Sequence, residues 1–137
     1  MPARFGLPTV PARLSADSLG LVRAGAGVTM LAQPTVLPRL LGADSATATR
    51  VTWVTQMLGA REVALGLGAF VALRRGGPAA RTWLVAGALA DSIDAVAVSA
   101  AIARGRASRV TGAGVVVTAA LAAATQLLAL RDLATED

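Results

Sequence analysis

Five charged residues lie near the middle of long apolar stretches of the sequence, where charges are least expected. They are Arg23, Arg61, Glu62, Asp91 and Asp94. Carboxyl groups in apolar surroundings can act as general acids or bases, and a neighbouring arginine adjusts their proton affinity. We therefore take the five residues as the candidate site, with Asp91, Asp94 and Glu62 as candidate acid/base groups and the two arginines as their ion-pair partners.

The spacing of these residues predicts how they pair. Asp91 and Asp94 are three positions apart, so they share one face of a helix. Arg61 lies about 100° around a helix from Glu62, so both face the protein interior only if their helix has neighbours on two sides. We expect Arg61 to pair with Asp91 or Asp94. Arg23 is then expected to pair with Glu62 or with the remaining aspartate.

Two alternatives follow for this cluster. With two arginines and three acids it carries one negative charge when fully ionised, and one acid can hold a proton instead because burial and like charges favour the neutral form. The ion pairs then either fix only the register of the helices, or they also bind, protonate or pass a molecule within the membrane.

Small and polar residues accompany the charges at helical spacing. Gly20 and Gly27 lie on the face of the first arginine, and Gly59 and Gly66 lie on the face of the glutamate. Glycines so placed let the backbones of two helices approach closely. Gln126 lies about 9 Å from the centre of the last apolar stretch. It is expected to line the mouth of the site or to form a helix–helix hydrogen bond.

The elements that must position these residues are four apolar stretches, each about as long as a helix that crosses a bilayer. They cover residues 16–32, 51–73, 82–103 and 110–130. The first is short and contains Arg23, which argues against its being a signal peptide. The sequence thus predicts an all-α, polytopic membrane protein with four transmembrane helices in an up-down bundle, forming one domain over residues 15–131.

The remaining segments are too short for a second domain. Residues 1–14 are expected to form a flexible or interfacial arm, and residues 132–137 an acidic tail. Within residues 33–50, two prolines exclude one continuous helix, and the leucines there predict a short helix along the membrane interface. Trp53 and Trp83 begin the second and third stretches, so an up-down bundle would place one tryptophan at each interface.

Composition agrees with a membrane protein and excludes several functions. The 137 residues are 55% hydrophobic and 15% charged, whereas soluble domains carry about a quarter charged residues. Mean hydropathy is +0.63. Cysteine and histidine are absent, which excludes disulfides, Cys/His zinc sites and Ser-His-Asp triads. The acidic pair on the third stretch lacks the repeated motif of the larger prenyl-transferring metalloenzymes, so we expect no metal and no cofactor.

The basic residues do not predict nucleic-acid binding. All 13 are arginines, and most lie between the apolar stretches, as expected near lipid headgroups, rather than in a stripe with aromatic residues. Six arginines fall on the side of both termini and five on the other, which favours cytoplasmic termini. The composition, rich in alanine and arginine, fits a bacterial protein of the cytoplasmic (inner) membrane.

Two segments resemble a known family. The second stretch contains Gly59, Ala60, Arg61 and Glu62 followed by the glycine pair Gly66 and Gly68, and the third contains Ala90, Asp91, Ser92, Ile93 and Asp94. Together with the first stretch and the linker around Pro38, Leu41 and Gly42, they resemble, over residues 16–130, a family of small four-helix bacterial membrane proteins of unknown function, common in actinobacteria. The resemblance implies the four-helix fold and no established activity.

Three functions remain open from the sequence. The first is an accessory subunit, or a bundle that binds membrane lipid or a partner. The second is an intramembrane enzyme that uses an aspartate as general acid on an apolar small molecule, such as an isoprenoid, sterol or polyketide, for isomerisation, cyclisation or epoxide opening. The third is a small proton-coupled transporter. A homodimer or a larger membrane complex is compatible with each, and a transporter of four helices favours a dimer.

Overall fold

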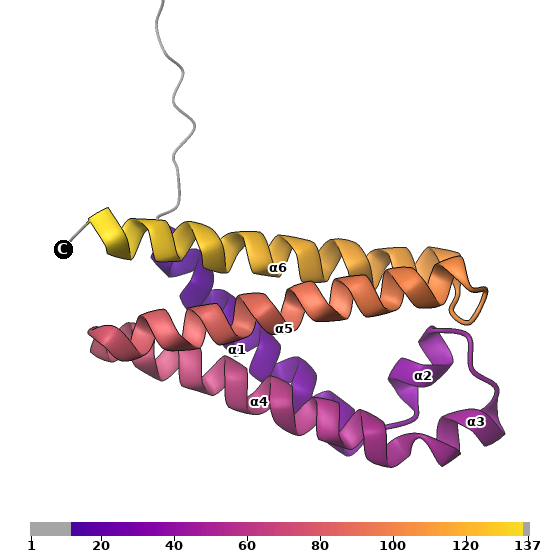
Figure 1. The fold of residues 1–137 in the computed structure, drawn as a ribbon. Coiled ribbons are helices and arrows are strands. Elements are labelled where there is room, and N and C mark those ends of the chain that lie inside the picture. The colour runs from indigo at the N-terminus through magenta and orange to yellow at the C-terminus, as the bar shows by residue number, and fades with distance from the viewer. Residues whose placement is uncertain (1–11, 136–137) are drawn as a thin grey trace, which may run out of the picture.

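The structure is a computed structural model that describes the backbone of residues 12–135 and the side chains of residues 16–134. Every regular element in that range is a helix, which confirms the all-α prediction (Figure 1). Four helices are long and two short ones lie between the first two long ones. In chain order they are α1 (Ala12–Ala32), α2 (Val36–Leu40), α3 (Ser45–Arg50), α4 (Thr52–Arg75), α5 (Pro78–Ala103) and α6 (Arg109–Thr135).

Three of the long helices, α4, α5 and α6, are long and apolar enough to cross a membrane. Their outer sides expose large apolar side chains, including Val96, Val110 and Leu121, and so much exposed apolar surface is unusual for a soluble monomer. The first predicted span, α1, is not among the three found within the described residues. Asp17, Arg23 and several small or hydroxyl residues lower its apolar content. Its role as a fourth span stays a prediction.

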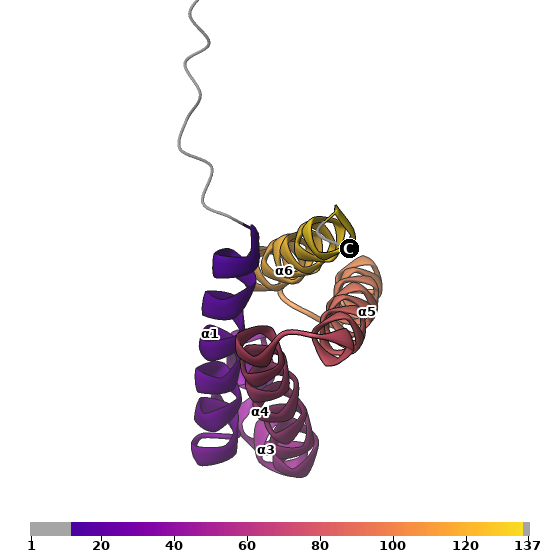
Figure 2. The same ribbon diagram turned by 90° about the vertical axis from the view of Figure 1, so that its left-hand side faces the viewer.

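The long helices pack mainly as two pairs, α1 with α4 and α5 with α6. The helices α5 and α6 run side by side in opposite directions (Figure 1). Helix α1 crosses obliquely from the C-terminal end of α6 to the N-terminal end of α4 (Figures 1 and 2). The two pairs are joined by a tight turn at Gly76 and Gly77, whose positive φ angles of 72° and 81° glycine adopts without strain.

The contact between α1 and α4 is made by glycine backbones. Gly20 lies opposite Gly66, and Gly27 lies opposite Gly59, so the two helices are antiparallel. A Cβ added at Gly20 would lie 2.8 Å from the Gly66 carbonyl oxygen, and one added at Gly59 would lie 2.8 Å from the Gly27 carbonyl oxygen. Any larger side chain at these positions would push the helices apart. The close approach expected from the glycine spacing is therefore present.

The contact between α4 and α5 is of a different kind. The indole ring of Trp83 lies over Gly68, where a Cβ would approach the ring carbons to 2.5 Å. Trp83 is half-buried in this contact, whereas Trp53 at the start of α4 is exposed. Trp83 thus packs α5 on α4, and its predicted place at a membrane interface stays a prediction.

Few large side chains are buried. Leu84 of α5 is the largest fully buried one among the described residues, and it clusters with Ala16 of α1 and Ala129 of α6. Most other buried apolar residues are alanines. Packing by small residues is typical of helices that associate in a membrane, where burying large apolar side chains gives no advantage over lipid.

Two short helices, rather than one, connect α1 to α4. Helix α2 includes Pro38, which fits because the N–H groups in the first turn of a helix have no intrahelical partner. Helix α3 is capped by Asp44, whose Oδ1 accepts hydrogen bonds from the N–H groups of Ala46 at 2.9 Å and Thr47 at 3.0 Å. Hydrogen bonds from the Thr47 hydroxyl and N–H lower the pKa of Asp44.

The segment containing α2 is fixed to the start of α6. The Ser108 N–H donates to the Leu41 carbonyl oxygen at 2.9 Å, and the Thr111 hydroxyl donates to the Leu40 carbonyl oxygen. These contacts place α2 over one end of the space between α1 and α6.

The helix ends differ slightly from the predicted segments. Helix α1 begins at Ala12, so residues 12–14 of the predicted arm are helical, and residues 1–11 lie outside the described range. Helix α6 ends at Thr135 and includes most of the predicted acidic tail, of which residues 136–137 lie outside that range.

Candidate functional site

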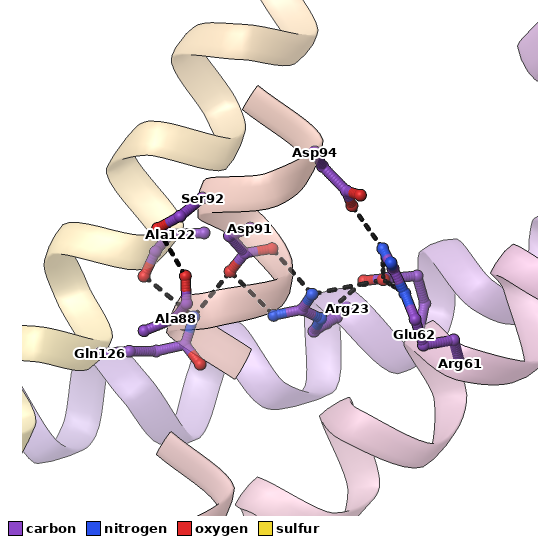
Figure 3. Close-up of polar contacts among 9 residues, drawn as sticks. All are labelled: Arg23, Arg61, Glu62, Ala88, Asp91, Ser92, Asp94, Ala122 and Gln126. Atoms are coloured by element: carbon purple, nitrogen blue, oxygen red, sulfur yellow. Dashed lines mark hydrogen bonds and ion pairs between the residues drawn. The ribbon is translucent and has the colours of Figure 1, made fainter. Parts of the chain in front are cut away.

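The five charged residues singled out in the sequence form one connected set of ion pairs, shown in Figure 3. We call this set, together with Gln126, the charged network. Its members come from all four long helices: Arg23 from α1, Arg61 and Glu62 from α4, Asp91 and Asp94 from α5, and Gln126 from α6.

Arg23 is the centre of the charged network. Its Nη1 and Nη2 donate to the two oxygens of Asp91 at 2.8 and 2.7 Å. Its Nε and Nη2 donate to the two oxygens of Glu62 at 2.6 and 3.3 Å. Bidentate, charge-assisted bonds of this kind are the strongest hydrogen bonds in proteins. One guanidinium, only 8% exposed as a residue, thus connects α1 to both α4 and α5.

Gln126 completes the buried end of the network. Its Nε2 donates to Asp91 at 2.7 Å and to the Ala122 carbonyl oxygen at 3.1 Å. Its amide group occupies the space that a side chain at Gly87 would fill. Of the two expectations for Gln126, the helix–helix hydrogen bond is confirmed. The other, a place at the mouth of the site, is not, because Gln126 is buried and does not line the large cavity described below.

The other end of the network is more open. The Nη2 of Arg61 donates to Asp94 and, at 3.1 Å, to Glu62. The side chains of Arg61 and Asp94 are 36% and 30% exposed, against 7% and 9% for Arg23 and Asp91. Within the described part of the chain, only one oxygen of Asp94 has a hydrogen-bond partner.

The structure decides between the pairings left open by the sequence. Arg61 pairs with Asp94, and Arg23 pairs with both Glu62 and Asp91. Glu62 lies between the two guanidinium groups, so acids and arginines alternate along the network (Figure 3). Helix α4 supplies both Arg61 and Glu62 because it has α1 on one side and α5 on the other, which is the condition expected from their 100° separation.

A partly open cavity of about 490 Å³ lies beside the network. Its walls are apolar and come mainly from α1 and α6. The leucines of the α2 segment, predicted to lie along a membrane interface, also line it. The wall includes Val22, Ala26, Leu37, Leu41, Gly114 and Ala119.

The charged residues that line this cavity, within the described part of the chain, all belong to the network. They are Arg23, Glu62, Asp91 and Asp94, and Arg61 is not among them. The cavity therefore combines a long apolar wall with one charged patch. Its α6 wall has a sequence signal in retrospect, because Gly114, Thr118 and Ala122 recur at a spacing of four and leave space along one face.

No known protein family, characterised protein or solved structure matches this chain. The resemblance to small four-helix membrane proteins of actinobacteria therefore stays a prediction. Among the described residues, no three acidic side chains gather as a metal site would require.

A second ion pair connects α1 and α4 away from the network. Asp17 accepts a hydrogen bond from Nε of Arg74 at 2.9 Å, and the Arg74 guanidinium lies 4.9 Å from the centre of the Phe70 ring. The sequence does not predict this pair, because it depends on the antiparallel register that the glycine contacts impose on α1 and α4.

Proposed function

We propose that this chain is a four-span membrane protein whose cavity binds one lipid-like molecule, and that it acts as a lipid-binding or accessory membrane subunit. The observation that carries the proposal is the cavity itself, with apolar walls and a charged patch at one place on its lining. An amphiphile, with an apolar chain and one polar group, matches that distribution. The volume of about 490 Å³ lies within the range of about 300–1,000 Å³ common for small-molecule sites.

The assignment of α1 as the fourth span is supported by the state of Arg23. A lone arginine at mid-membrane costs about 2.5–3.5 kcal/mol even on permissive insertion scales. Here its guanidinium is engaged by two carboxylates, which removes the main objection to α1 as a span. The composition supports a bacterial inner membrane, and the six-to-five distribution of arginines supports cytoplasmic termini.

The enzyme and transporter alternatives both need a carboxyl group that exchanges a proton. Asp91 and Glu62 each bind guanidinium nitrogens through both oxygens, so neither is well placed to do so. Asp94 has one oxygen without a partner in the described part of the chain and lines the cavity. In either alternative, Asp94 is therefore the carboxyl group that would exchange the proton.

The proposal is tested by photo-crosslinking in lipid nanodiscs with a dodecanol that carries a diazirine near the end of its chain. We expect the probe to label the cavity face of α6 around Ala119 more strongly than its lipid-facing side around Leu121. Gly114→Leu fills the cavity from a position where an added Cβ meets nothing within 4 Å. We expect it to reduce the cavity labelling severalfold.

Gly25→Leu is the matched control. Gly25 is also a helical glycine with nothing within 4 Å of an added Cβ, but it does not line the cavity. Labelling in this variant should equal that of the original chain. Equal labelling of the two faces of α6, unchanged by Gly114→Leu, would show that the cavity holds no such molecule.

A further inference from the structure

The charged patch of the cavity keeps a carboxylate oxygen without a hydrogen-bond donor in the described part of the chain. Arg23 is the one arginine that lines the cavity among the described residues, and four of the five N–H groups of its guanidinium donate to Glu62 or Asp91. The second oxygen of Asp94 has no such partner. A ligand that reaches this patch thus meets a carboxylate oxygen that needs a donor.

The charge of the network points the same way. Two arginines and three acids give a formal charge of −1, and no other charged residue in the described range lines the cavity. An anionic headgroup would bring the total charge to −2 in a medium of low polarity, where like charges repel strongly. A single positive charge would bring the sum to zero.

From these two observations we infer that the ligand of the cavity is a monocationic amphiphile, a long-chain ammonium compound whose head donates to Asp94. The chain of such a molecule lies against the apolar walls, between Val22 and Ala26 of α1 and Ala119 of α6. This inference rests on the proposed binding function and adds the chemical class of the headgroup.

Three probes with the same chain and the same diazirine separate the possible headgroups: dodecylamine, dodecanol and dodecanoate. They are compared in nanodiscs at pH 7, where the amine is protonated, with the labelling of the cavity face of α6 measured against probe concentration. The protonated amine adds an ion pair with Asp94 to the hydrogen bond that the alcohol can also donate, so we expect half-maximal labelling by the amine at about one-tenth of the dodecanol concentration or less. Dodecanoate should label most weakly.

Two variants assign the effect to Asp94. Asp94→Asn removes the charge and keeps the shape of the side chain. It should raise the concentration of amine needed for half-maximal labelling to that of the alcohol and leave the value for the alcohol unchanged. Asp94→Glu keeps the charge and should keep the preference. Both variants are compared by size-exclusion chromatography and circular dichroism, so that loss of the fold is seen directly.

The outcomes separate this inference from the function on which it rests. Labelling of the cavity by all three probes at similar concentrations, or best by dodecanoate, would overturn the ammonium headgroup and leave lipid binding in place. Cavity labelling by none of the three would overturn the binding function itself. An amine preference that survives Asp94→Asn would overturn the role of Asp94.

Discussion

Asp91 and Asp94 are the same residue type on the same helix, three positions apart, yet their surroundings differ sharply. Asp91 is buried, accepts from two nitrogens of Arg23 and is also bound by Gln126. Asp94 is about a third exposed and accepts a hydrogen bond from one nitrogen of Arg61, although both aspartates line the cavity. The charged network therefore has a structural end at Asp91, where both carboxylate oxygens have hydrogen-bond partners, and an available end at Asp94, where one oxygen has none among the described residues. The two ends differ in the number of hydrogen-bond partners and not in residue type.

The helix contacts repeat this contrast. Helices α1 and α4 touch through two pairs of facing glycines about two turns apart, whereas the contact between α4 and α5 includes the Trp83 ring over Gly68 and the Arg61–Asp94 pair. Substitutions at Arg23 and in the glycine contact are therefore expected to cost more stability than a substitution at Asp94.

Loss of the centre of the network should have the largest effect. Removing one partner of a buried ion pair costs about 3–5 kcal/mol because it leaves an unpaired buried charge. We expect Arg23→Gln to lower the free energy of unfolding by this amount, measured by denaturant titration in detergent. Arg104→Gln in the exposed α5–α6 turn is the control and should change it by about 0.5 kcal/mol at most. Equal effects of the two substitutions would refute a structural role for Arg23.

The glycine contact comes next. In Gly66→Ala the new methyl group would meet the backbone of Gly20 and Ala24, and overpacking of this kind costs about 1–3 kcal/mol. Gly25→Ala meets nothing within 4 Å and should be neutral or stabilise the helix by up to about 1 kcal/mol. The same titration measures both, and a stability of Gly66→Ala at or above that of Gly25→Ala would contradict the close contact.

The available end of the network should contribute little to stability. Asp94 accepts one hydrogen bond from Arg61, and Arg61 keeps its hydrogen bond to Glu62 when Asp94 is replaced. We therefore expect Asp94→Asn to lower the free energy of unfolding by about 1 kcal/mol, the net contribution of one hydrogen bond. A loss as large as that of Arg23→Gln would mean that both ends of the network are structural.

The smallest effect should come from the segment that covers the cavity. Hydrogen bonds from Thr47 hold the pKa of Asp44 below its ordinary value, so the cap stabilises the fold above the unfolded-state pKa of about 4 and is lost as pH falls through the lower folded-state value. Thermal unfolding from pH 6 to pH 3 should show a small loss of stability below about pH 4.

Asparagine caps helices as well as aspartate but does not titrate in this range. In Asp44→Asn the contribution of this cap should therefore become independent of pH, whereas Asp44→Ala should lose it at every pH. An unchanged acid profile in Asp44→Asn would assign the pH dependence to another group.

Much of the helix content and of the network was predictable from the sequence. Apolar stretches and their interruptions mark α4, α5 and α6, and the mid-stretch position of Arg23, Arg61 and the acids predicts that they meet. The partners of Asp91 and Asp94 were not predictable, because both lie on one helical face and their spacing does not say which arginine each meets.

The position of Gln126 and the cavity also required the structure. A glutamine in an apolar helix predicts a hydrogen bond but not its partner, which here depends on the absence of a side chain at Gly87. The leucines of the α2 segment predict an apolar surface. That they line a cavity follows from the hydrogen bonds of Leu40 and Leu41 to the start of α6, which local sequence does not encode.

The distribution of the network along the chain has a consequence for biogenesis. The carboxylates that neutralise Arg23 lie 39 and 68 residues later in the sequence. As a ribosome delivers the chain from its N-terminus, α1 emerges with its arginine unpaired and must wait for α4 and then α5. In the four-span arrangement, α1 thus has both of its carboxylate partners only after α5 has followed it, and the arrival of Asp91 completes that step.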